Sequence, residues 1–328
     1  MKVQNENTGT NLNRELADWL SQLRNKRNFN PQKYLQRKSE LLKQYMAQCR
    51  LKACVIGISG GVDSAVSLAI LKQASILPSS PIQEIRALLL PVFSNKAASN
   101  QKEAVNRGIE LCISLGITPS IIDLTDSHRR LAETATNALQ VNEDGWSLGQ
   151  LVSHIRTPAL YFATSLLAKE GKPAVVIGTT NFDEGGYLGY FGKASDGLVD
   201  LQLIADIHKS EIYLLGKLLN LPQSILQAIP SGDMFDGRSD EEVFGASFDF
   251  VELYLSYLRM KKSDQENLRN KWKKDTFAQF QLLGNRLEKL HSYNQHKYFS
   301  KSPAVHLDIL PSSMPGGWNS KNRTVYRP

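Results

Sequence analysis

The 328-residue sequence contains only three cysteines, and it has no apolar run near the roughly 20 residues that a membrane-spanning helix requires. Cys49, Cys54 and Cys112 lack metal-ligand spacing, so we expect reduced thiols and a cytoplasmic protein. Residues 1–13 are polar, lack the apolar core of a signal peptide and are expected to form a disordered tail. No Ser/His/Asp or Cys/His set for covalent catalysis stands out.

Two common nucleotide-binding motifs are also absent, the Walker A loop GxxxxGK[ST] and the dinucleotide fingerprint GxGxxG. The net charge is nevertheless +7, with basic residues gathered in segments 24–27, 37–38 and 271–274. No zinc-finger or RNA-recognition signature accompanies them. We therefore expect anionic small substrates rather than nucleic acid, and no membrane partner.

Short apolar segments alternate with segments of helical periodicity along the first two thirds of the chain. Their apolar residues are continuous rather than alternating, which is typical of parallel strands buried on both faces. This pattern predicts an α/β fold, a doubly wound and mostly parallel sheet with helices on both faces, in one domain over 14–300. Helical extensions are expected at both ends, over 14–48 and after Lys209, and the Pro-, Gly- and Ser-rich residues 301–328 are expected to be a tail. The predicted strands are 53–58, 85–90, 120–124 and 174–178, and the predicted helices between them are 65–71, 96–115 and 147–169.

The turn after the first predicted strand reads Ser-Gly-Gly-Val-Asp-Ser, residues 59–64. Its glycines let the backbone turn sharply and approach an anion, and the amides of the following helix would face that anion. Asp63 can hold Mg²⁺ that bridges phosphate oxygens. The segment therefore predicts a nucleotide-phosphate site made of Gly57, Ile58, Ser59, Gly60, Gly61, Val62, Asp63 and Ser64.

A second polar, glycine-rich stretch, residues 178–200, follows the fourth predicted strand. Ligands of such sheets bind beyond the carboxyl ends of the strands, where Thr179 would lie. Glu184 can supply a second oxygen ligand for Mg²⁺, and Lys193 can stabilise developing negative charge. Asp196 and Asp200 can accept hydrogen bonds from ribose hydroxyls or ammonium.

The 59–64 hexamer resembles the SGGxDS loop of the ATP pyrophosphatase (PP-loop) superfamily, and residues 178–200 resemble the signature region of NAD synthetases. The resemblance extends over about 53–297, with the motifs in the same order. It implies an adenine nucleotide alpha hydrolase-like fold. It also implies a carbon–nitrogen ligase with ATP as co-substrate and Mg²⁺ as metal. The ligase would amidate deamido-NAD with ammonia through an adenylated intermediate.

The resemblance also assigns roles to single residues. Thr179, Lys209 and Ser231 fall on ATP contacts, and Asp63 and Glu184 on the magnesium site. The expected contacts to deamido-NAD are His154, Arg156, Lys193, Asp200, His296 and Lys297. Asp63, Lys193, Lys209 and Asp233 are the expected catalytic residues, with Asp233 handling the ammonium proton.

One helix departs from the family pattern. Arg156 matches the second arginine of that pattern, but His154 stands where a substrate-contacting arginine is expected. Histidine is shorter, largely neutral at pH 7 and unable to form a bidentate fork. We expect a weaker or altered contact to the nicotinate side of the substrate.

The same resemblance implies a homodimer, with the helix at 147–169 supplying much of the interface. Glutamine-using members carry an amidase domain, for which the about 50 residues before the first strand are too few. Free ammonia, or ammonia from a separate partner, is therefore expected. Two alternatives stay open: a tRNA-modifying PP-loop enzyme, and a nucleotide-binding homologue with weakened catalysis.

Overall fold

The computed structural model describes residues 12–93, 101–232 and 237–328. Within them, a seven-stranded sheet runs in the order β3-β2-β1-β4-β5-β6-β7, and every neighbouring pair is parallel. The strands are β1 (Ala53–Gly57), β2 (Glu84–Leu89), β3 (Pro119–Ile121), β4 (Ala174–Gly178), β5 (Leu201–Gln202), β6 (Val305–His306) and β7 (Thr324–Val325). The predicted doubly wound parallel sheet is confirmed.

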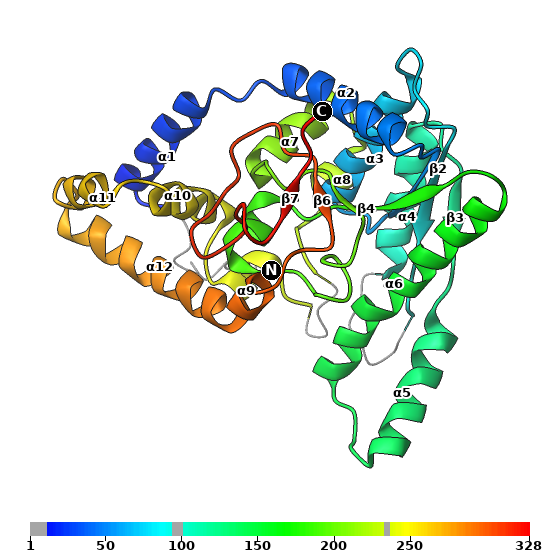
Figure 1. The fold of residues 1–328 in the computed structure, drawn as a ribbon. Helices are drawn as coiled ribbons and strands as arrows, with labels where there is room; N and C mark the ends of the chain where they lie inside the picture. Colours follow the sequence, from blue (N-terminus) through cyan, green and yellow to red (C-terminus); the bar gives the residue numbers. More distant parts are fainter. Residues whose placement is uncertain (1–11, 94–100, 233–236) are drawn as a thin grey trace, which may run out of the picture.

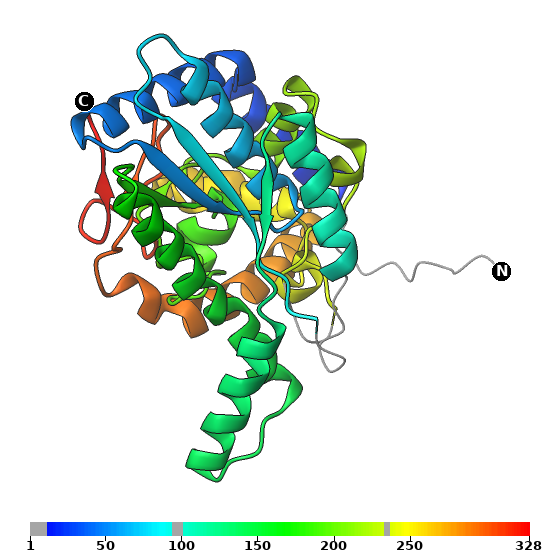
Figure 2. The same cartoon turned by 90° about the vertical axis from the view of Figure 1, so that its right-hand side faces the viewer.

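Helices cover both faces of the sheet because alternate strand residues point to opposite sides. On β1, Cys54 and Ile56 belong to one core with α2 (Pro31–Gln48), α3 (Val62–Ile76), α4 (Gln101–Ser114) and α7 (Lys209–Leu218). Ala53 and Val55 of the same strand belong to the opposite core, with α6 (Gly145–Lys169). Figure 2 shows this layering.

A separate group of helices lies beside the sheet and forms its own core (Figure 1). It contains α1 (Arg14–Arg27), α10 (Phe248–Leu258) and α12 (Lys274–Asn294) around Trp19, Phe250 and Phe280. Smaller elements complete the chain: α5 (Thr125–Leu139), the π-helix η1 (Glu184–Leu188), α8 (Gln223–Leu226), α9 (Asp240–Phe244), α11 (Lys262–Arg269) and the 3-10 turn η2 (Gln295–Tyr298). No helix among the described residues has the length and apolarity needed to cross a bilayer.

The two terminal segments are built into the fold more closely than the sequence suggested. The expected extension over 14–48 divides its two helices between two cores, α2 in that of the sheet and α1 in that of the helical group. The expected tail over 301–328 supplies β6 and β7 and so extends the sheet. Two-residue strands show no periodicity, which is why composition alone suggested a tail.

The disordered tail expected over residues 1–13 ends earlier than predicted, because its last two residues belong to the fold. Leu12 packs against the core of the helical group, and Asn13 caps α1 by accepting the N–H of Leu16 at 3.0 Å. Residues 1–11 of the predicted disordered tail lie outside the described residues, as do 96–100 of the predicted helix 96–115. The predicted end of that helix holds, since Gly116 takes a φ of 64° just after α4.

Candidate active site

The turn between β1 and α3 has the geometry of an anion-binding loop. Gly61 caps α3 without a side-chain cap bond, so among the described residues the N–H groups of the first turn of this helix are left for a ligand. Ser64 Oγ lies 3.1 Å from Ser59 Oγ and donates to Gly61 O at 3.1 Å, which ties the two arms of the turn together. Gly60 has a φ of 77°, and a Cβ there would lie 2.4 Å from the Ala104 carbonyl oxygen. Only glycine fits this position without strain.

Three charged side chains from distant parts of the chain meet beside this turn. Asp63 comes from the first turn of α3, Glu184 from the start of η1 and Lys209 from the start of α7. The Lys209 ammonium lies 2.6 Å from Asp63 Oδ2 and 3.3 Å from Glu184 Oε1. The Lys209 side chain is 4% exposed, so these charges interact with little screening by water.

Burial and the neighbouring charges shift the pKa values of Glu184 and Lys209. Desolvation, together with the nearby carboxylates of Asp63 and Asp240, raises the pKa of Glu184 to about 8, and the Lys209 ammonium opposes this shift. Desolvation alone would lower the pKa of Lys209, but the surrounding carboxylates outweigh it and raise that pKa. Lys209 therefore stays cationic at neutral pH.

The donor set fits a magnesium ion. Asp63 and Glu184 both reach the Lys209 ammonium, so their carboxylates lie near one another, and a divalent cation beside Lys209 would further relieve their mutual repulsion. In the described part of the chain, no cluster of three or more His, Cys, Asp or Glu side chains suits a metal. Mg²⁺ in nucleotide enzymes is usually held by one or two carboxylates plus substrate phosphates, so two suffice.

Several supporting residues were quoted in the sequence motifs but given no role there. Asn181 donates to Asp63 Oδ1 at 2.8 Å and also accepts the Glu184 N–H at 3.0 Å. Asp183 accepts the Lys209 N–H at 2.7 Å and lies 2.6 Å from His208 Nδ1. Burial lowers the pKa of His208, but Asp183 outweighs that effect and raises it. These contacts fix the start of α7, and only the fold could reveal them.

Beside the turn, a pocket opens at the carboxyl ends of β1, β2 and β4, where the doubly wound fold predicts it. Arg156 lines it and donates to Leu90 O at 3.1 Å and to Gln101 Oε1 at 3.3 Å. His154, on the same helix, is not part of the lining. The pocket combines apolar walls with polar edges, as a nucleoside requires. Its lining includes Gly57, Ile58, Ser59, Leu88, Leu89, Leu90, Pro91, Arg156, Thr179, Ser195 and Asp196.

Of the residues expected to contact deamido-NAD, Arg156 lines this pocket, and the others do not. Lys193 and His296 are exposed at the surface. Asp200 accepts the Val176 N–H at 2.7 Å and the Tyr161 hydroxyl at 3.3 Å. These bonds give Asp200 a structural part, and its substrate contact stays a prediction.

Lys297 points back into its own chain, where it donates to Gly189 O at 2.8 Å and Phe191 O at 2.6 Å. Burial and the nearby Lys193 lower the pKa of Lys297 to about 8. Ser231, an expected ATP contact, is exposed, and Asp233 lies outside the described residues.

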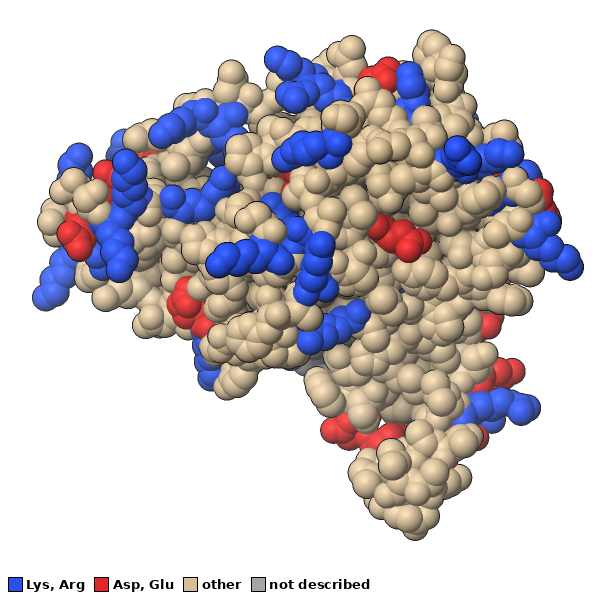
Figure 3. Space-filling model, viewed as in Figure 1, with Lys and Arg blue, Asp and Glu red and all other residues tan. Residues whose placement is uncertain are grey.

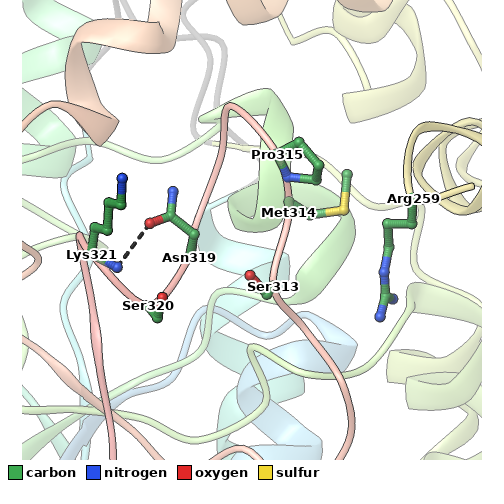
Figure 4. A pocket seen from close by; sticks show the side chains of 7 residues that line it. All are labelled: Arg259, Ser313, Met314, Pro315, Asn319, Ser320 and Lys321. Carbon is green, nitrogen blue, oxygen red and sulfur yellow. Dashed lines mark hydrogen bonds between the residues drawn. The ribbon is translucent and has the colours of Figure 1, made fainter. Parts of the chain in front are cut away.

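Figure 4 shows a second hollow, between the end of α10 and the C-terminal segment. It contains none of the predicted site residues. Its lining is Arg259, Ser313, Met314, Pro315, Asn319, Ser320 and Lys321.

Comparison with known proteins decides the family. The model of the NAD synthase family matches residues 34–299, most of the chain. The chain belongs to the NAD synthase family. Among curated relatives, it is 31% identical to the NH3-dependent NAD synthetase of Wolinella succinogenes, over 73% of this chain and 85% of that protein. It is 29% identical to the corresponding Pyrococcus furiosus enzyme, over 83% of this chain and 93% of the relative.

Solved structures of NAD synthase relatives share the fold. The NH3-dependent NAD synthetase of Campylobacter jejuni is 25% identical, with a TM-score of 0.57, over 80% of this chain and 94% of that one. An NMN synthetase from Francisella tularensis is also 25% identical, with a TM-score of 0.62, over 82% and 96% of the two chains. Membership of this family makes the protein a carbon–nitrogen ligase of NAD synthesis with ATP as co-substrate, and it disfavours the tRNA-modifying alternative.

Proposed function

We propose that this enzyme joins ammonia to the carboxylate of deamido-NAD and converts ATP to AMP and pyrophosphate. The observation that carries the proposal is the meeting of Asp63, Glu184 and Lys209 beside a glycine-bent turn whose helix N-terminus is open. This arrangement places positive charge and free N–H groups where the outer phosphates of ATP would lie.

The reaction would proceed in two displacements. The deamido-NAD carboxylate attacks the α-phosphorus, the bond to the β-phosphate oxygen breaks, and pyrophosphate leaves. Lys209 and the N–H groups of the turn neutralise the charge that develops on this leaving group. Ammonia then attacks the acyl carbon, loses a proton, and releases AMP and NAD. Mg²⁺ held by Asp63 and Glu184 would add electrostatic stabilisation of the phosphates.

The two buried thiols do not support a covalent route. Burial raises the pKa of Cys54 to about 12 and that of Cys112 to about 11, so neither forms a thiolate at neutral pH. Cys49 is free as well, and free thiols support a reducing, cytoplasmic setting.

A product assay tests the function. Purified protein with Mg-ATP, deamido-NAD and ammonium is expected to give NAD and AMP in equal amounts, and glutamine in place of ammonium is expected to give neither. NAD formed from glutamine would overturn the proposed ammonia source. ADP in place of AMP would overturn the proposed chemistry, and nucleotide binding without AMP would point to a homologue with weakened catalysis.

A mononucleotide acceptor is the second candidate. It is favoured by the similarity to an NMN synthetase and by His154, which stands where the family pattern has an arginine. The same assay with nicotinate mononucleotide distinguishes the two acceptors. If deamido-NAD is the acceptor, His154→Arg should tighten its binding by about 1 kcal/mol. Unchanged affinity would remove His154 from the substrate site.

We also propose that the enzyme is a homodimer through α5 and α6. In Figures 1 and 2, α5 and the start of α6 project from the body as a hairpin, and the rest of α6 lies against the sheet. Leu139 of α5 is 72% exposed, and Phe162 and Leu166 of α6 are 64% and 50% exposed. Such apolar side chains favour association. Sedimentation should give twice the chain mass for the wild type and the monomer mass for Phe162→Glu; a monomeric wild type would exclude the dimer.

A further inference from the structure

The π-helix that carries Glu184 is held from outside by the C-terminal part of the chain. Each carbonyl oxygen from residue 185 to residue 189 accepts a hydrogen bond from that part. The donors are the Tyr298 hydroxyl at 2.7 Å, the Trp318 N–H at 2.9 Å, His291 Nδ1 at 2.6 Å, Asn294 Nδ2 at 3.0 Å and the Lys297 ammonium at 2.8 Å. A π-helix is rare and frequently marks a functional site, and this one is fixed by remote residues.

Trp318 packs tightly against this helix. Its side chain is 3% exposed. A Cβ on Gly185 would lie 2.2 Å from the Trp318 indole ring, and a Cβ on Gly317 would lie 2.0 Å from Gly186 O. The two segments therefore meet backbone to backbone, and Gly185 is directly bonded to Glu184. A shift of Trp318 would therefore move Gly185, and with it the adjacent residue Glu184, the expected metal ligand.

The segment that carries Trp318 is anchored to the sheet. The indole ring packs edge to face on His306 of β6, with centroids 4.6 Å apart, and lies 5.6 Å from the Phe191 ring. Met314 N–H donates to Trp318 O at 2.7 Å, and Asn322 Nδ2 donates to Gly317 O at 3.0 Å. These contacts hold the segment against the sheet, and neighbouring residues of the segment, among them Met314 and Asn319, line the hollow in Figure 4.

We propose that Trp318 is a positioning residue for Glu184, so that the C-terminal segment sets the divalent-cation affinity of the active site. Trp318 lies beyond residues 34–299, the part of the chain that the family model matches. Metal sites need their ligands held within about 0.5 Å, and supporting residues typically contribute about 10- to 100-fold in metal affinity. The inference rests on the proposed function for the role of Glu184.

A matched pair of substitutions tests it. Trp318→Leu removes the ring against η1, and Trp19→Leu removes a ring that is also buried but packs on Tyr257 and Trp272 in the helical group. The measured quantity is the affinity of the intact protein for Mn²⁺ in the presence of a non-hydrolysable ATP analogue. Electron paramagnetic resonance detects the bound Mn²⁺. Trp318→Leu is expected to weaken Mn²⁺ binding by about tenfold and to raise the Mg²⁺ concentration for half-maximal NAD formation by a similar factor. Trp19→Leu should lower the melting temperature and leave the Mn²⁺ affinity unchanged.

Equal Mn²⁺ affinity in the wild type and Trp318→Leu would overturn the inference, as would an equal loss in both variants. Should Trp318→Leu not fold, Trp318→Phe keeps part of the ring, and an Mn²⁺ affinity about threefold below the wild type would support the role. Wild-type affinity in that variant would exclude it. A wild-type protein that binds Mn²⁺ but forms no NAD would refute the proposed function and leave the positioning role testable.

Discussion

The two halves of the candidate site are built in different ways. The phosphate turn, residues 59–64, is held mainly by its own residues, such as the Ser59 and Ser64 hydroxyls. The Glu184 helix is held by residues about 100 positions away or more, from His291 to Trp318. A local motif can therefore be recognised in the sequence, while the half that depends on distant packing cannot.

Loss of Asp63 should have the largest effect, because this residue joins the two halves through Lys209. Asp63→Asn is expected to lower kcat by about 10²- to 10³-fold, since a carboxylate that would hold Mg²⁺ at the phosphates is lost. AMP release at saturating ATP is the measurement. Asp249→Asn, which affects an exposed pair with Arg24, serves as the control and should stay near wild type. Normal turnover by Asp63→Asn would exclude its metal role.

Gly60→Ala tests the phosphate turn, residues 59–64, which is held mainly by its own residues. Both the φ of 77° and the collision with Ala104 O oppose a Cβ, so the free energy of unfolding should fall by about 1–3 kcal/mol and ATP binding should weaken. Gly171→Ala is a matched control, because its φ of 76° is similar but no atom lies within 4 Å of the added Cβ. Urea denaturation and ATP titration give both quantities. Equal effects at the two glycines would show that the close approach to Ala104 is unimportant.

Gly185→Ala tests in the same way the helix η1, which is held by residues far along the chain. The added Cβ collides most closely with the Trp318 ring and also with Thr180 Cγ2, so removing that ring should relieve the larger part of the clash. In a double-mutant cycle with Trp318→Leu, measured by urea denaturation, the coupling is expected to be about 0.5–3 kcal/mol. Strictly additive effects would show that the two segments are independent.

The smallest expected effect concerns the anchor of Trp318. Burial, with Arg323 and Lys38 nearby, lowers the pKa of His306 well below its usual value, so the folded protein keeps this imidazole neutral. As pH falls below about 6.5, the unfolded chain binds a proton that the folded one does not. The free energy of unfolding of the wild type should therefore decrease as the pH is lowered. This decrease should exceed that of His306→Gln by up to about 1.4 kcal/mol per pH unit. Parallel profiles for both proteins between pH 7 and 5 would contradict this.

How far the sequence predicts the fold depends on the length of each element. Strands β1 to β4 and helix α6 were predicted because their apolar residues extend over several positions. Residues 125–139 were not predicted as a helix, because His128 is their one buried residue and no side chain caps α5. Strands β5, β6 and β7 are two residues each, too short for any period.

The sequence by itself determined the parallel sheet, the anion-binding turn and the residue types of the site, because these depend on neighbours in the chain. Only the tertiary structure decided that Lys209 lies between Asp63 and Glu184, that Lys297 binds its own backbone and that Trp318 supports η1. Such contacts join segments with no common pattern. They depend on how buried side chains fill space and find hydrogen-bond partners, which the whole fold settles at once.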